Sequence, residues 1–205
     1  MIRPSRPPAR ARRALAAMAL TAAAGLAAAG CEGGAIGAST VASNGKSFVS
    51  GAGTATTFAP GSRPAAPAVT GTSLTGGKIT LASYRGRVLV LNFWGSWCTP
   101  CREEAPALAA LARRFRSAPV RFLGVDISDN ADAAKAFMRT FNINYPSLSD
   151  PGDTIALDFH GSLPPNAIPS TLVIDPRGRV AARVVGGVSY RGLEALIGKV
   201  AAGRS

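Results

Sequence analysis

The sequence predicts an α/β domain in which helices flank a central mixed β-sheet. Three observations point to this fold class. Residues 88–93 form a run of apolar and β-branched side chains, which is typical of a strand buried on both faces. After residue 100, large apolar residues recur at spacings of three and four, as they do on one face of a helix. The Asp-Pro-Arg-Gly turn at 175–178 separates two further apolar runs and predicts an antiparallel hairpin.

The other elements follow from alternation, turn residues and capping residues. A hairpin around Gly76-Gly77 forms a small N-terminal β addition, and Asp129 or Asn130 caps the second helix. Four principal strands are expected in the sheet. The predicted elements are the hairpin 69–74 and 78–81, strand 88–93, a helix after 100, strand 120–127, a helix to 141, a short helix 153–159, a Pro-rich loop 163–169, strands 171–174 and 180–185, and a helix 190–202.

Length, composition and charge exclude several classes of protein. With 205 residues, of which 47% are apolar, the chain can build one domain with a real core but not two large ones. The net charge of +12 includes five arginines ahead of the first apolar run, and the remaining +7 is spread along the chain. No basic cluster with interleaved aromatic residues occurs there, so we expect no nucleic-acid partner.

The N-terminal segment predicts export. Residues 1–13 are rich in Arg and Pro and contain no acidic residue, and 14–29 are almost uniformly apolar. This is the pattern of a secretory signal peptide, assigned to 1–30, and the apolar run is shorter than the roughly 20 residues that a membrane-spanning helix needs. Arg12-Arg13 matches a twin-arginine signal only weakly, because the usual aromatic-leucine continuation is missing.

Cys31 follows directly after this signal and predicts a membrane anchor. Ala28-Ala29-Gly30-Cys31 resembles a bacterial lipobox, in which the cysteine is lipidated, although Ala28 replaces the usual leucine. An ordinary signal-peptidase cut after the alanines would instead leave Cys31 as a stray thiol. We expect lipidation at Cys31, a flexible Gly/Ala/Ser/Thr/Pro tether over 31–66, and the folded domain over 67–203.

Cys98 and Cys101 carry the predicted chemistry. They stand two residues apart where the strand 88–93 leads into a helix. A helix N-terminus stabilises a thiolate and lowers the pKa of the first cysteine from about 8.5 toward neutrality. Cys98 is therefore the expected nucleophile and Cys101 the resolving thiol. A purely structural disulfide closing so short a loop adds little stability, and a zinc site lacks ligands because His160 is the only histidine.

The motif resembles a known family. Residues 92–101, Asn-Phe-Trp-Gly-Ser-Trp-Cys-Thr-Pro-Cys, with Pro106 five residues on, resemble a thioredoxin-fold active site. Gly86-Arg87-Val88 before the strand, Glu104, and residues 168–171, Ile-Pro-Ser-Thr, before the turn at 175–178 resemble the TlpA/ResA-like group of anchored bacterial disulfide reductases. The resemblance covers roughly 67–202 and implies a thioredoxin fold.

The resemblance also implies roles for individual residues. Pro169 would be a cis-proline facing the cysteines, and the exposed backbone of Ile168 would pair with an extended substrate segment. Glu104 would be the acid that exchanges a proton with Cys101. The alternative for Pro169 is an ordinary loop proline. The alternative for Glu104 is a carboxylate that only interacts favourably with the helix dipole. The expected substrate contacts are Trp97, Thr99, Pro100 and Ile168.

Some positions depart from the family pattern. Thioredoxin usually carries a buried Asp where this chain has Asn92, and an amide cannot shuttle a proton, so more of that role falls to Glu104. The loop 158–169 is about three residues longer than is usual in the group, so its substrate contacts are not carried over. His160 is expected to be a surface residue.

The sequence therefore predicts an exported thiol-disulfide oxidoreductase with no cofactor and no metal, active as a monomer. The leading expectation is a reductase of exported proteins, such as apocytochrome c or copper-site cysteines, supplied with electrons by a membrane partner because the compartment is oxidising. The same residues fit a dithiol oxidase running in reverse. A copper-carrying module lacks an added soft or imidazole ligand, and a thiol peroxidase does not normally use a compact CxxC.

Overall fold

A computed structural model of the chain describes residues 39–43 and 46–203. All of them belong to one compact unit, residues 36–205. The expected signal peptide over 1–30 and the expected lipidation site at Cys31 lie outside the described residues. Within the described ranges, no helix has the length and apolar character required to cross a membrane.

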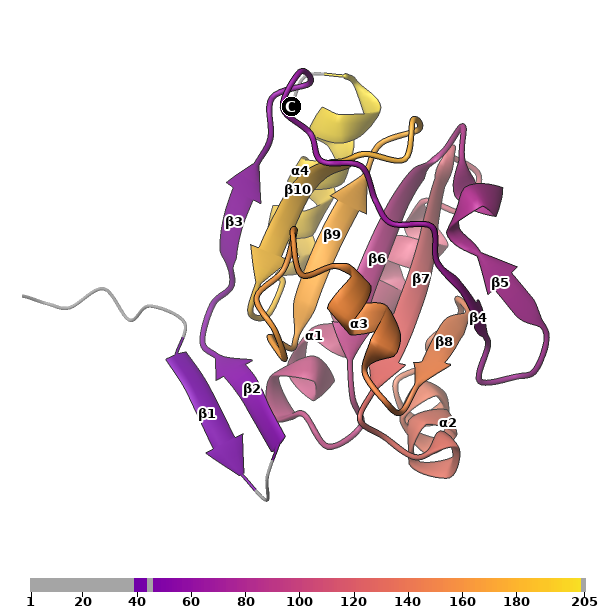
Figure 1. The fold of residues 1–205 in the computed structure, drawn as a ribbon, viewed down its shortest axis with the longest axis vertical. Helices are drawn as coiled ribbons and strands as arrows, with labels where there is room; N and C mark the ends of the chain where they lie inside the picture. The colour runs from indigo at the N-terminus through magenta and orange to yellow at the C-terminus, as the bar shows by residue number, and fades with distance from the viewer. Residues whose placement is uncertain (1–38, 44–45, 204–205) are drawn as a thin grey trace, which may run out of the picture. The chain divides into compact units, whose positions relative to one another are not determined.

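The centre of the domain is a mixed sheet with the strand order β3-β10-β9-β6-β7-β8 (Figure 1). The neighbours β6 and β7 are parallel, as are β7 and β8. The pairs β6–β9, β9–β10 and β10–β3 are antiparallel. The predicted mixed sheet is thereby confirmed. Its strands are β3 (Thr54–Thr57), β6 (Val88–Trp94), β7 (Val120–Ile127), β8 (Ser147–Asp150), β9 (Ser170–Ile174) and β10 (Val180–Val185).

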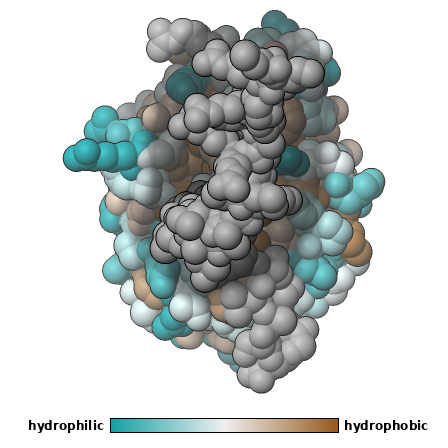
Figure 2. All heavy atoms as spheres, turned by 90° about the vertical axis from the view of Figure 1, so that its left-hand side faces the viewer, coloured by the Kyte–Doolittle hydropathy of each residue, from teal (hydrophilic) through white to brown (hydrophobic). Residues whose placement is uncertain are grey.

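The sheet has six strands where four were expected, because two short polar strands escape the sequence pattern. β8 has the sequence Ser-Leu-Ser-Asp, and β3 has the sequence Thr-Ala-Thr-Thr, so neither shows an apolar run. Each forms by backbone pairing with a longer strand, β8 on β7 and β3 on β10. β3 forms one edge of the sheet, and hydrophobic and hydrophilic residues are interspersed on that side of the molecule (Figure 2).

Helices cover the sheet, with α1 and α4 behind it and α3 in front in the view of Figure 1. Asn130 is the cap of α2, since its Oδ1 accepts a hydrogen bond from the Ala133 N–H at 2.9 Å. All four predicted helices are present. They are α1 (Thr99–Arg114), α2 (Ala131–Thr140), α3 (Thr154–Asp158) and α4 (Tyr190–Ala201).

Strand β6 divides the core into two apolar clusters. Leu89, Leu91 and Phe93 belong to one cluster, and Val88 and Val90 belong to the other, because alternate side chains of a strand point to opposite faces. Every residue of β6 is buried, as the continuous apolar run predicts. This central strand ends beside the cysteine motif, so a rigid element positions the turn that follows.

Two small antiparallel pairs lie outside the main sheet. β4 (Thr70–Thr72) and β5 (Lys78–Thr80) form the predicted hairpin, which is followed by a 3-10 helix, η1 (Leu81–Tyr84). β1 (Ser39–Ser43) pairs with β2 (Lys46–Ser50), which the sequence did not predict.

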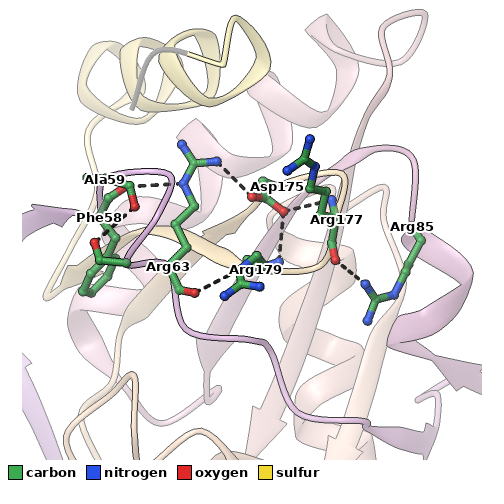
Figure 3. A network of polar contacts seen from close by, with 8 residues as sticks. Phe58, Ala59, Arg63, Arg85, Asp175, Arg177 and Arg179 are labelled. Atoms are coloured by element: carbon green, nitrogen blue, oxygen red, sulfur yellow. Dashed lines mark hydrogen bonds and ion pairs between the residues drawn. The ribbon is translucent and has the colours of Figure 1, made fainter.

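The segment expected to be a flexible tether over 31–66 is largely structured where it is described. It contains β1, β2 and β3, and its final part is fixed by Arg63 (Figure 3). The Arg63 guanidinium donates to Asp175 Oδ2 at 2.9 Å and to the Phe58 carbonyl at 3.3 Å, while Arg179 Nε donates to the Arg63 carbonyl at 3.0 Å. Backbone pairing and this buried ion pair stabilise the segment. Its own side chains are small, so the sequence pattern did not indicate that it would pack. Residues 54–66 therefore pack as part of the domain.

Asp175 is held in its charged form. Burial raises the pKa of this carboxyl group, but hydrogen bonds from the Arg179 N–H, the Arg63 side chain and the Arg177 N–H outweigh that effect and leave the pKa below its usual value. The contribution of the ion pair to stability is therefore fully present above about pH 4 and is lost as the pH falls through the lowered pKa.

We expect Asp175→Asn to lower the free energy of unfolding at pH 7 by about 3 kcal/mol, because it leaves the buried Arg63 guanidinium without its carboxylate. Glu194→Gln is the matched control, since the Arg114–Glu194 pair is 59% and 32% exposed and exposed pairs contribute less than about 1 kcal/mol. Urea denaturation measures both changes. The loss in free energy of unfolding caused by Asp175→Asn should become smaller below pH 4. Equal losses in the two variants would show that the buried ion pair contributes no more than the exposed one.

Candidate active site

Cys98 and Cys101 form a disulfide at the start of α1, with their Cα atoms 5.3 Å apart. Cys98 is the N-cap residue of the helix, and its Sγ accepts a hydrogen bond from the Cys101 N–H at 3.3 Å. Cys98 has 0% exposed surface and Cys101 has 1%. A backbone N–H directed at Cys98 Sγ, together with the positive end of a sixteen-residue helix, favours a thiolate at Cys98 once the disulfide is reduced.

The turn between β6 and α1 is fixed by a glycine and by an acid from another loop. A Cβ at Gly95 would lie 2.6 Å from Trp97 Nε1, so the indole can pack against this position only because residue 95 has no side chain. The Cys98 N–H donates to the Gly95 carbonyl at 3.1 Å, and the Ser96 N–H donates to Asp129 Oδ2 at 2.6 Å. Asp129, considered in the sequence only as a helix cap, instead anchors the active-site turn.

The loop before β9 faces this turn. The Ile168–Pro169 peptide bond is cis, as the resemblance predicted. Ile168 is buried in the apolar cluster that also contains both cysteines, and Trp97 packs against this cluster. The Pro169 carbonyl accepts from the Gly186 N–H at 2.8 Å, and the Ile168 carbonyl accepts from the Val49 N–H at 2.6 Å. The backbone position expected to pair with a substrate is thus engaged by β2.

The expected contact residues of the CxxC motif differ in their exposure. Thr99 is exposed, Pro100 is buried in the first turn of α1, and Trp97 is partly buried. Among these three, Thr99 is the one that presents its side chain freely to an approaching protein.

Glu104 is buried beneath the cysteine pair, with 3% of its surface exposed. Its Oε1 accepts from Asn92 Nδ2 at 2.8 Å, and its Oε2 accepts from the Val188 N–H at 2.9 Å. Asn92 Nδ2 also lies 3.2 Å from Thr171 Oγ1. Burial raises the pKa of Glu104 to about 8, and the hydrogen bonds from Val188 and Asn92 moderate that increase.

Tyr145 is a second buried group at this site, and no sequence motif identifies it. A cavity of about 10 Å³ is lined by Asn92, Cys101 and Tyr145 among other residues, which is near the least space that one water molecule occupies. Burial raises the pKa of Tyr145, and the nearby Glu104 charge raises it further. Polar groups from three elements therefore meet beneath Cys101.

No group of three His, Cys, Asp or Glu side chains within the described part of the chain is placed to hold a metal ion. His160 is exposed, as expected, and its Nδ1 lies 2.9 Å from the Leu157 carbonyl.

The raised pKa of Glu104 predicts a pH-dependent stability. An unfolded chain loses this proton near pH 4.3, whereas the folded chain keeps it until about pH 8, so wild-type stability falls between these values by up to about 1.4 kcal/mol per pH unit. Glu104→Gln removes this slope. The glutamine oxygen can accept from the Val188 N–H, and the Asn92 amide can turn to accept from its NH₂ group.

Urea denaturation of the oxidised protein from pH 4 to 9 measures this difference. The exposed neighbour Glu103 provides the control, because Glu103→Gln should keep the wild-type dependence on pH. A Glu104→Gln variant whose stability falls between pH 4.3 and 8 as steeply as that of the wild type would show that Glu104 is not protonated in the folded state.

Comparisons with known proteins identify the family of the chain. The model of the AhpC/TSA family matches residues 63–183. Thiol-disulfide oxidoreductase ResA of Bacillus subtilis is 34% identical over 111 residues, which are 54% of this chain and 60% of that protein. ResA of Bacillus cereus is 30% identical over 135 residues, which are 66% of this chain and 76% of that protein. The structure of a secreted thiol-disulfide isomerase from Corynebacterium glutamicum matches with a TM-score of 0.68 and 28% identity, covering 72% of this chain and 92% of that one. The chain therefore belongs to the AhpC/TSA family of thioredoxin-fold proteins and is a relative of the ResA thiol-disulfide oxidoreductases.

Proposed function

We propose that this protein is an exported thiol-disulfide oxidoreductase that reduces disulfides of other exported proteins through Cys98 and Cys101. The observation that carries the proposal is the position of Cys98 as N-cap of α1, bonded to Cys101 and accepting its N–H. A thiolate in this position is both stabilised and paired with a resolving thiol. The names of the ResA relatives support the same reaction class.

The proposed reaction transfers two electrons from the cysteine pair to the substrate, and the two protons that the substrate thiols gain come from water. In the reduced protein, the Cys98 thiolate attacks a substrate disulfide, its S–S bond breaks, and the departing sulfur takes up a proton from water. Cys101 then gives its proton to Glu104 and attacks the sulfur of Cys98 in the mixed disulfide. This step releases the second substrate sulfur, which takes its proton from water, and restores the Cys98–Cys101 bond.

Glu104 is the proposed proton-exchange partner of Cys101. Its carboxylate form, which a pKa of about 8 makes the minor form at pH 7, accepts the Cys101 proton. Glu104 lies three residues after Cys101, so the two side chains share a face of α1. A carboxyl group with a pKa of about 8 is closer to the pKa of a thiol than an ordinary glutamate, and general catalysis is most effective when the pKa of the catalyst lies near the working pH. Glu104 would return the proton when the pair is reduced again.

The substrate side of the site is the backbone at Ile168 together with Trp97, Thr99 and Pro100. An extended substrate segment pairs with the Ile168 carbonyl while Pro169 packs beside the sulfurs. Apocytochrome c and proteins with copper-site cysteines are substrates of the expected kind, since both need reduced thiols outside the cytoplasm.

Export and anchoring complete the proposal. The leader at 1–30 directs the chain out of the cytoplasm, and lipidated Cys31 holds it at the outer face of the membrane, where a membrane electron donor re-reduces the pair. The secreted relative from Corynebacterium glutamicum supports export.

The direction of electron flow is tested by the reduction potential of the pair. We expect a value of about −300 mV, because a reductase must hold its disulfide more stably than its substrates do. Cys31→Ser protein equilibrated in thiol-disulfide buffers, with alkylation of the free thiols, measures this potential without interference from the third cysteine. A value of about −120 mV would contradict the reductase function and favour a dithiol oxidase.

A further inference from the structure

β2 occupies the backbone edge at the active site. The Val49 N–H donates to the Ile168 carbonyl at 2.6 Å, directly before the cis peptide bond. This contact places β2 beside the loop that faces the cysteines, and β2 also contacts α1. Val49 is itself buried, and Cys98 has 0% exposed surface. The nucleophilic sulfur is therefore covered in this arrangement.

The side chains of β2 are apolar where they meet the domain. Phe48 packs against the core cluster that contains Cys98 and Ile168. A Cβ placed on Gly186 would lie 3.4 Å from Val49 Cγ1, so the valine side chain packs close to the backbone that follows β10. One backbone hydrogen bond and two apolar side chains are the contacts by which an added strand binds a sheet edge.

The segment that carries β2 can leave without unfolding the domain. Among the described residues, β2 pairs with β1 alone in a two-stranded sheet, which is marginally stable on its own. Gly51, with φ of 90°, separates β2 from the domain, and Gly53 is fixed beyond it. The Gly53 N–H donates to the Gly187 carbonyl at 3.0 Å, and a Cβ on Gly53 would lie 2.6 Å from Val184 Cγ1. If β2 is displaced, the chain from Gly53 onward can therefore stay in place, because Gly53 is held close to the backbone of the domain.

We propose that β2 is an internal occupant of the substrate-docking edge, and that the partner which displaces it is an extended apolar protein segment flanking a cysteine. This inference rests on the proposed function, because it concerns how a substrate reaches Cys98. An incoming strand replaces the contacts that β2 gives up if it offers an N–H to the Ile168 carbonyl and apolar side chains to the surface that Phe48 and Val49 cover. A polar segment lacks the apolar side chains, and a folded segment cannot present its backbone N–H, so both leave Cys98 covered.

The test is the rate at which iodoacetamide alkylates Cys98 in the reduced full-length chain carrying Cys31→Ser. Val49→Pro removes the N–H that bonds Ile168. That N–H is directed away from β1, so the pairing of β1 with β2 keeps its own hydrogen bonds. We expect alkylation to accelerate about five- to tenfold, in line with the loss of one backbone hydrogen bond. An alkylation rate within twofold of the parent would overturn the proposal.

A second variant guards against a local effect of proline. Val49→Asp keeps the N–H but cannot bury its charge against the core, so it should also accelerate alkylation. Ser117→Asp is the control, since Ser117 is exposed beyond the opposite end of α1 and should leave the rate unchanged. An unchanged thermal unfolding transition verifies that each variant folds.

Exchange with a protein disulfide separates this inference from the proposed function. If alkylation accelerates in both Val49 variants but no variant reduces a protein disulfide such as that of insulin, the internal occupant stands and the reductase function fails. If the parent reduces insulin and the Val49 variants change neither alkylation nor reduction, the function stands and the internal occupant is wrong.

Discussion

The carboxyl group of Glu104 joins three parts of the fold, and the geometry of the cysteine pair depends on it. Its two oxygens accept hydrogen bonds from Asn92 on β6 and from the Val188 N–H ahead of α4. These bonds hold the start of α1 against the central strand, because Glu104 lies less than one turn after Cys101. The cysteines at the helix start are therefore held by the most buried part of the sheet rather than by an exposed loop. The same burial raises the pKa of Glu104 to about 8, so one interaction sets both position and proton chemistry.

Everything else at the site is arranged around that fixed turn. Asp129 holds the backbone of Ser96, and the indole of Trp97 packs over Gly95. The loop with the cis Ile168–Pro169 bond approaches from the far side. The helix N-terminus stabilises a negative charge on Cys98 Sγ, while the apolar surroundings disfavour a charge elsewhere in the site. The attacking thiolate is thus stabilised at Cys98 Sγ. In the proposed arrangement, β2 covers this atom and controls access to it.

Much of this was predictable from sequence because the responsible patterns are local. A continuous apolar run identifies β6, and the CxxC at a helix start identifies the redox pair. The cis bond before β9 followed from family resemblance, not from local physics. Strands β3 and β8 escaped prediction, because they are short and polar and exist by pairing with neighbours. Tyr145 and the Val188 N–H belong to no motif, and the fold alone brings them to Glu104.

The contact of Val49 with Ile168 illustrates the same limit. Residues 31–66 are poor in large side chains, which favours a flexible segment when considered in isolation. The backbone hydrogen bond from Val49 to the Ile168 carbonyl needs no large side chain, and the ion pair of Arg63 with Asp175 joins residues 112 positions apart. Sequence patterns describe what a segment can bury by itself, and here the stabilising partners belong to the rest of the domain.

The central claim is that Cys98 attacks and Cys101 resolves, and trapping the mixed disulfide tests it most directly. Cys101→Ser leaves the nucleophile in place and removes the thiol that releases the product. Expressed in its native host, this variant should accumulate proteins bound to Cys98, detectable as adducts that reducing agent removes, whereas Cys98→Ser should accumulate none. Adducts that form equally in both variants, or on Cys98→Ser alone, would contradict the assignment of the two sulfurs.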